Sequence, residues 1–214
     1  MEVATPGRDA AEDRLRAAIT RGEMPPGHRM VEADLAEVLG VTRNAVRLAI
    51  DALIAEGLVE RIPNRGARVR TVSVAEAIEI VECRMVLEGL LAAKAAERIT
   101  DAEIDRLRGQ TDAMQQAVAD GDLLEYSSLV AQLHALIRDT ARQATAGRLI
   151  ERLQAQIVRH QFQLSLRPGR ARLSFTELQR VVEAIAARDP RAAETAARSH
   201  LQSVVAALAE SAAH

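Results

Sequence analysis

A short predicted helix followed at once by a two-stranded hairpin constrains this chain more than any other feature. The helix begins after Thr42, whose hydroxyl can cap it, and extends to about Glu56. The segments 58–62 and 67–70 alternate apolar and polar residues on either side of a Pro-Asn-Arg-Gly turn at 63–66, which is typical of two antiparallel strands. A helix of this kind, with arginines in its first turns and a basic hairpin beside it, is suited to enter a DNA groove.

Two further helices precede this one. The segment 32–39 has apolar residues at helical spacing, and Gly40 stands where a left-handed cap would end the helix. Two short helices joined by a glycine-containing turn form the helix-turn-helix pattern. With the helix expected at 9–20 and the hairpin, the pattern predicts a winged helix-turn-helix domain over about residues 8–70.

The helix after Thr42 separates its polar residues from its apolar ones. At about 100° per residue, Arg43, Asn44 and Arg47 fall on one arc, away from the large aliphatic residues. Arginine can donate two hydrogen bonds to guanine, and asparagine can read adenine. We therefore predict DNA contacts by Thr42, Arg43, Asn44 and Arg47, and by the wing-tip residues Asn64, Arg65 and Gly66. The alternative is a surface helix whose arginines are only solvated.

The net charge of −2 does not by itself favour a nucleic-acid partner. The charges are segregated along the chain, however. Residues 61–70 hold four arginines and no acid, whereas Glu32, Asp34 and Glu37 lie together on the preceding helix. Segregated charge can serve a phosphate backbone even when the total is near zero.

Residues 73–212 carry only helical signals and predict an all-α bundle. The chain has no Trp, one Tyr and two Phe, so its cores must be built from aliphatic side chains, which favours helices. Helix starts are expected at capping boxes and at an Asp-Pro pair: Ser73 with Glu76, Thr100 with Glu103, Ser174 with Glu177, and Asp189-Pro190. Breaks are expected at Gly121, Gly147 and Pro168-Gly169, while Gly109 can also lie within a helix. The predicted fold class is mainly α, a winged helix-turn-helix followed by six or seven helices.

The stretch 22–69 resembles the N-terminal domain of GntR-type bacterial transcription regulators. The resemblance rests on Gly-Glu-Met-Pro-Pro-Gly-His-Arg at 22–29, on the run 32–43, on Glu-Gly-Leu-Val at 56–59 and on Asn-Arg-Gly at 64–66. In that family the residues matching Thr42, Arg43, Asn44 and Arg47 contact the operator, aided by the wing tip. Ala33 stands where the fatty-acid-responsive members have a further DNA-contacting arginine, so their operator sequence cannot be transferred to this chain.

The helical domain resembles the effector-binding FCD domain of the FadR-like branch of the same family. This second resemblance rests on Glu-Cys-Arg at 82–84, Leu-Glu-Gly at 87–89 and the run 183–190. It implies a homodimer formed through the helical domains and a small metabolite, often a carboxylate, bound within each. A repressor released by its ligand is the commoner arrangement in that family, with a ligand-responsive activator as the alternative.

Many members of that family hold a metal ion through an Asp or Asn, a His four residues later and two further His 22 residues apart. This chain keeps His134 and His200, but Val130 and Leu178 occupy the other two positions. Aliphatic side chains offer no donor atom to a cation. We therefore expect no bound metal and no other cofactor.

Arg84, His134 and His200 are the candidate effector-binding residues. Arg84 could anchor a carboxylate through two hydrogen bonds. It could equally pair with Glu88, one helical turn away, and the histidines could be interior residues with a purely structural role. The sequence leaves the identity of the effector open.

Other classes of protein fit less well. The chain has no glycine-rich phosphate loop and no serine nucleophile motif, and Cys83 has no obvious basic partner, so we expect no enzyme. A helical adaptor would not need an arginine-bearing wing. A single cysteine indicates a reducing compartment, and neither a signal peptide nor a membrane-spanning run is present. We expect a cytoplasmic protein that binds double-stranded DNA, a small molecule and a second copy of itself, and no membrane.

Overall fold

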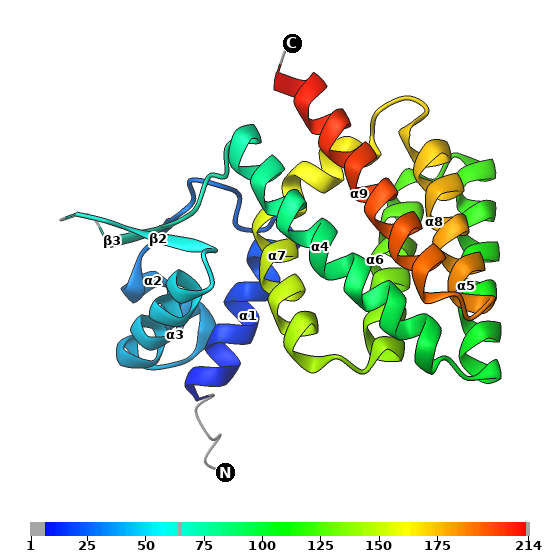
Figure 1. Ribbon diagram of the computed structural model, residues 1–214. Helices are drawn as coiled ribbons and strands as arrows, with labels where there is room; N and C mark the ends of the chain where they lie inside the picture. The colour runs from blue at the N-terminus through cyan, green and yellow to red at the C-terminus, as the bar shows by residue number, and fades with distance from the viewer. Residues whose placement is uncertain (1–6, 64–65, 213–214) are drawn as a thin grey trace. The chain divides into compact units, whose positions relative to one another are not determined.

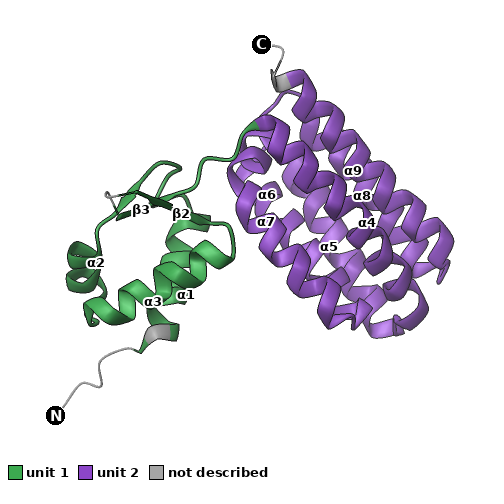
Figure 2. Ribbon diagram, turned by 60° about the vertical axis from the view of Figure 1, so that its left-hand side comes forward, with its two compact units in different colours: residues 1–73 green, residues 74–214 purple. Residues whose placement is uncertain are grey.

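The computed structural model describes the backbone of residues 7–63 and 66–212. The chain divides into two compact units, Met1–Ser73 and Val74–His214 (Figure 2). Within the described ranges the first unit contains α1 (Arg8–Thr20), β1 (Arg29–Met30), α2 (Glu32–Leu39), α3 (Arg43–Ala55), β2 (Val59–Ile62) and β3 (Gly66–Val69). The second contains α4 (Val74–Arg98), α5 (Asp101–Asp120), α6 (Leu123–Ala141), α7 (Ala144–Ser165), α8 (Arg170–Ala186) and α9 (Pro190–Ala212) (Figure 1). The predicted fold class, mainly α, is confirmed.

The helix-turn-helix is formed by α2 and α3. Gly40 ends α2 in the left-handed conformation at φ 66°, which glycine adopts without a steric cost. The Thr42 hydroxyl then accepts a hydrogen bond from the Ala45 backbone N–H at 3.2 Å and so caps α3. Both local predictions are confirmed, since each depends on residues adjacent in the sequence.

The wing is part of a three-stranded antiparallel sheet with the order β1-β3-β2. The predicted hairpin pairs Val59 with Val69 and Ile62 with Gly66. The short strand β1 was not predicted, because two residues are too few to show an alternating pattern. It pairs with β3 by placing Met30 opposite Ala67.

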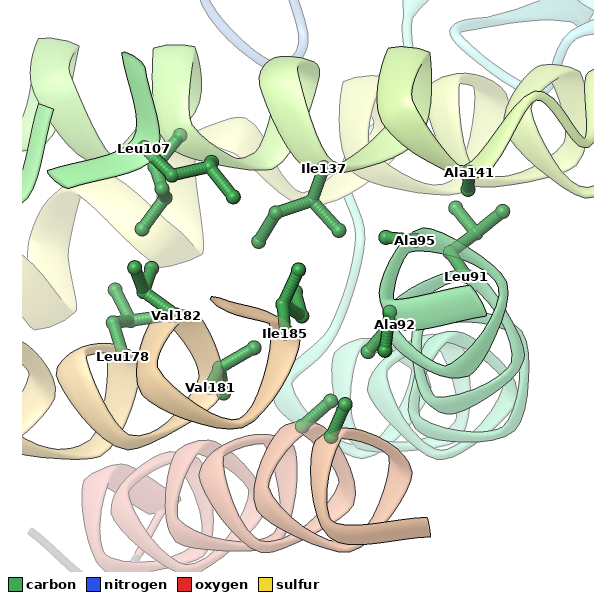
Figure 3. Close-up of a cluster of buried hydrophobic side chains, with 14 of the residues drawn as sticks. Leu91, Ala92, Ala95, Leu107, Ile137, Ala141, Leu178, Val181, Val182 and Ile185 are labelled. Atoms are coloured by element: carbon green, nitrogen blue, oxygen red, sulfur yellow. The ribbon is translucent and has the colours of Figure 1, made fainter. Parts of the chain in front are cut away.

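The helical unit is organised around one aliphatic core. Figure 3 shows side chains from several helices pointing toward one another, among them Leu91 of α4, Leu107 of α5 and Ile185 of α8. The long helices α4 and α9 pack along each other in both ribbon views (Figures 1 and 2). The expectation of an aliphatic core follows from the shortage of aromatic residues and is confirmed, with the buried Tyr126 as an aromatic member.

Three of the four predicted helix starts in this unit are confirmed. Helix α4 begins at Val74, directly after Ser73. The Thr100 hydroxyl accepts from the Glu103 backbone N–H, and the Glu103 carboxylate accepts from the Thr100 backbone N–H at 2.9 Å, which completes the capping box. The Asp189 carboxylate accepts from the backbone N–H groups of Arg191 and Ala192 at the start of α9.

The predicted start at Ser174 is wrong, as is the break at Gly147. Helix α8 begins at Arg170, directly after Gly169, because the intervening Arg-Ala-Arg-Leu segment consists of good helix formers. Gly147 lies in the first turn of α7, which the Gln143 side chain caps. Gly109 lies within α5.

We expect Leu107→Ala to destabilise the protein by about 2–5 kcal/mol, because it leaves a cavity in the core of the helical unit. The Leu107 residue is 1% exposed, whereas Leu124, also in a helix, is 65% exposed. The control Leu124→Ala should change stability by no more than about 0.5 kcal/mol. Denaturant unfolding of the full chain, followed by its helical circular dichroism, measures both. Equal effects of the two substitutions would contradict the assigned core.

Candidate nucleic-acid interface and interior cavity

The outer arc of α3 presents the predicted DNA-contacting residues to solvent. Thr42, Arg43, Asn44 and Arg47 are all exposed. The Arg47 guanidinium lies 3.3 Å from a carboxylate oxygen of Glu32 on α2. An exposed ion pair at this distance contributes little stability, so Arg47 can leave Glu32 for a phosphate or a base.

The inner face of α3 fixes the direction of that arc. Val46, Ala49, Ile50 and Leu53 are buried, and α3 packs against α1 and α2. The Arg16 guanidinium of α1 also pairs with Glu56 at 2.7 Å, just beyond the end of α3. The exposed side chains therefore extend from a helix supported on its whole opposite face, which is the arrangement that a precise binding site needs.

Two arginines of the wing form ion pairs that the sequence does not suggest. Arg61 pairs with Asp51 of α3, and Arg68 pairs with Glu60 on the neighbouring strand at 2.6 Å. The fold thus brings acids from α3 and β2 to a segment that has none in its own sequence. Gly66 opens β3 at φ 85°, a conformation that favours glycine. The other two wing-tip residues of the prediction, Asn64 and Arg65, lie outside the described residues.

An interior cavity lies within the helical unit, lined by residues of α4, α6, α7, α8 and α9. Its empty space, counted with its opening to solvent, is about 390 Å³. Most of the lining is aliphatic, and the polar lining residues are Glu88, His134, Arg138, Gln154 and His200. A mainly apolar pocket with a few polar groups is typical of a small-molecule site.

A buried arginine holds the carboxylate on one side of this cavity. Arg84 is 1% exposed, and its Nε and Nη2 donate to one oxygen of Glu88 at 2.8 and 2.6 Å. The other Glu88 oxygen lies 3.2 Å from Nδ1 of His134. Burial raises the pKa of Glu88, but the Arg84 charge and then His134 outweigh it and bring this pKa below its ordinary value. Of the two roles open to Arg84, the structure therefore shows the pairing with Glu88, and Arg84 does not itself line the cavity.

A second histidine is held in the same way. Nδ1 of His200 lies 2.8 Å from an oxygen of Glu177, and the Arg170 guanidinium lies 3.4 Å from that oxygen. Burial lowers the pKa of His200, so its ring is neutral at pH 7 and Nδ1–H donates to Glu177. The rings of His134 and His200 line one cavity with centroids 6.2 Å apart.

Several residues of this network carry no sequence signal. Glu177 fits a capping box, but it lies inside α8 and faces His200. Arg138 and Gln154 belong to different helices, and only the fold brings them together at the cavity. The one usable signal is the four-residue spacing of Arg84 and Glu88, which places both on one helix face.

The two aliphatic residues in the expected metal-ligand pattern both lie in apolar surroundings. Leu178 lines the cavity, and Val130 packs against the aliphatic core. Across the described part of the chain, no three His, Cys, Asp or Glu residues are grouped in a way that could hold a metal ion.

A winged helix-turn-helix joined to an all-helical unit defines a class of two-domain DNA-binding transcription regulators. The family described as bacterial regulatory proteins, gntR family, matches residues 8–69, and the FCD domain matches residues 79–203. The chain therefore belongs to the GntR family, in the FadR-like branch that carries an FCD domain. It is a DNA-binding transcription regulator and not an enzyme, as the sequence predicts.

Similar proteins agree with this assignment. An uncharacterised HTH-type regulator of Agrobacterium vitis, from the TAR-I ttuE-ttuC' intergenic region, is 33% identical over 62% of this chain and 80% of its own length. A probable D-xylose utilization operon repressor of Paenarthrobacter nicotinovorans is 29% identical over 93% of this chain and 87% of its own. The solved structure of E. coli McbR/YncC shares the fold, with a TM-score of 0.80, 22% identity and coverage of 98% and 99% of the two chains.

No helix among the described residues has the length and apolar character needed to cross a membrane.

We expect Glu88→Ala to destabilise the protein by about 3–5 kcal/mol, because it leaves the Arg84 charge buried without its carboxylate. A matched control is Glu194→Ala, which breaks an exposed pair of the same four-residue spacing with Arg198. The control should cost no more than about 0.5 kcal/mol. The midpoint of denaturant unfolding of the full chain measures both substitutions. A loss at Glu88 as small as that at Glu194 would contradict the buried pairing.

Proposed function

We propose that the protein is a ligand-responsive repressor that binds a near-palindromic operator as a homodimer. The observation that carries this proposal is the solvent-facing arc of Arg43, Asn44 and Arg47 on a helix whose opposite face is buried. Repression, rather than activation, is supported by the relative from P. nicotinovorans, which is a probable repressor. In this proposal the regulator acts in the cytoplasm, where it meets its operator.

In the proposed complex α3 enters the major groove. Arg43 and Arg47 face guanine edges or phosphates, Asn44 reads a base, and Thr42 lies near the backbone. The wing tip at Asn64, Arg65 and Gly66 approaches the minor groove or the adjacent phosphates. Two chains related by a twofold axis place two such units on inverted half-sites.

The effector in this proposal binds the cavity of the helical unit. His134 and His200 line this cavity. Arg84 does not line it, and instead holds Glu88 in place through two hydrogen bonds. A ligand that binds one arrangement of the dimer more tightly than another changes the operator affinity by that difference.

We further propose that the helical unit functions without a metal ion. Val130 and Leu178 supply no donor, and the nearby carboxylates of Glu88 and Glu177 are already engaged by arginines. Two imidazoles alone make a poor site for a divalent cation.

Elemental analysis of the purified full chain should therefore find far less than one transition-metal ion per chain. Treatment with a chelator should leave the unfolding temperature unchanged, since no folding energy comes from a metal. Stoichiometric metal that survives dialysis would overturn this part of the proposal.

The recognition helix is tested by Arg43→Ala and Arg47→Ala. Each should weaken binding to an operator selected with the wild-type chain by about 1–3 kcal/mol, or roughly 5- to 150-fold, because a base or phosphate contact is lost. The control Arg106→Ala removes the same charge from an exposed position on α5 in the other unit and should leave affinity unchanged. Fluorescence anisotropy at fixed salt measures all three. Unchanged affinity in both α3 variants would refute the recognition-helix assignment.

A further inference from the structure

The outer arc of α3 carries a large aliphatic side chain among its polar ones. Leu48 is 40% exposed, whereas Val46 and Leu53 of the same helix are 0% exposed. Counted from Arg43 at about 100° per residue, Asn44 lies at roughly 100° and Leu48 at roughly 140°. On the same count the buried Val46 and Leu53 lie at roughly 300° and 280°. Leu48 therefore lies beside Asn44, on the side of α3 that faces away from the core of its unit.

The neighbours of Leu48 distinguish it from an ordinary surface leucine. Single exposed aliphatic residues are common on proteins and need no partner. Leu48, however, follows Asn44 by four residues, or one helical turn, and directly follows Arg47, and both neighbours are exposed. In the proposed complex Asn44 and Arg47 reach into the major groove, so the Leu48 side chain enters the groove with them and loses its water.

The chemistry of the groove floor decides what such a side chain can contact. Each base pair presents hydrogen-bond acceptors and amino donors there, and the C5 methyl group of thymine is the apolar group. An aliphatic side chain placed over an acceptor or an amino group removes water without replacing the hydrogen bond, which is costly. Placed over a thymine methyl group, it removes apolar surface of both partners from water, which is favourable. The thymine methyl group is therefore the matching partner for Leu48.

The next turn of the arc is occupied by an ion pair. Asp51 follows Leu48 by three residues, and its carboxylate pairs with Arg61 of β2. This pairing balances an acid that would otherwise repel the DNA phosphates, and it engages the Asp51 side chain within the protein. The part of the outer arc available for base contacts therefore spans residues 43–48 and ends at Leu48.

We propose that Leu48 is a specificity-determining residue that contacts the C5 methyl group of one thymine in each half-site. This thymine lies within about one or two base pairs of the base that Asn44 contacts, because a helical turn advances about 5.4 Å and successive base pairs are about 3.4 Å apart. The inference rests on the proposed operator contacts of α3, and it adds one base and the atom that is recognised.

Deoxyuridine tests this contact, because it differs from thymidine only by lacking the C5 methyl group. Each thymine of one half-site, in an operator selected with the wild-type chain, is replaced in turn, and fluorescence anisotropy at fixed salt measures the affinity. We expect at least one replacement to weaken wild-type binding by roughly 3- to 10-fold, which is the size of the loss of one buried methyl group. A selected half-site without thymine, or one in which no replacement weakens binding, would overturn the inference.

The variant Leu48→Ala connects the methyl group with the side chain. It should bind the unmodified operator roughly 3- to 10-fold more weakly than the wild type does, and the same deoxyuridine should then cost less than about twofold, because the contact is already lost. Leu48→Met keeps an apolar side chain of similar length and should remain sensitive to deoxyuridine. The control Leu124→Ala removes an exposed leucine from α6 in the other unit and should match the wild type on both operators. An equal deoxyuridine loss in the wild type and in Leu48→Ala would overturn the assignment.

The same measurements separate this inference from the function on which it rests. If the wild-type chain selects no specific DNA sequence, the proposed function itself fails. If it selects an operator whose binding Arg43→Ala weakens, but no deoxyuridine effect depends on Leu48, the regulator remains and the Leu48 contact is wrong.

Discussion

Two carboxylates, the buried Glu88 and the partly buried Glu177, are each shared between an arginine and a histidine, and the helical unit depends on this constraint. Glu88 connects Arg84 of α4 with His134 of α6, and Glu177 is held in α8 by Arg170 and in α9 by His200. A buried charge costs several kcal/mol unless its partners keep good geometry. A shift of α6 along α4, or of α9 along α8, would leave a charge unpaired. The aliphatic core can tolerate such a shift more easily, because apolar contacts are not directional.

This constraint also supports the proposed ligand site in the interior. Each carboxylate fixes the Nδ1 side of one imidazole, so the two rings keep a defined orientation toward the cavity. Arg84 and Arg170, which balance the charges of the carboxylates, do not line the cavity. In the proposed site, the groups that face the cavity are therefore positioned before a ligand arrives, which reduces the entropic cost of binding.

The winged helix-turn-helix could largely be predicted from sequence because its signals are local. Gly40 and Thr42 act on neighbouring residues, and the apolar spacing of α3 fixes its buried face. The pairings of Arg61 with Asp51 and of Arg68 with Glu60 could not be foreseen, since they depend on how the strands and α3 meet. In the helical unit the four-residue spacing of Arg84 and Glu88 allows a pairing to be considered, but nothing in the sequence relates Glu177 to His200 or Arg138 to Gln154. The start of α8 was missed for a different reason: Gly169 and the helix-forming residues after it outweigh the capping motif at Ser174.

The claim that this chain reads an operator as a symmetric pair is tested most directly by selecting DNA from a random library with the full chain. We expect the enriched sequences to contain two inverted copies of one half-site, because a twofold dimer presents α3 twice with opposite polarity. Enrichment should disappear when the salt concentration is raised enough to release phosphate contacts. A library with no enriched sequence, or with a single half-site that lacks its inverted copy, would contradict the account.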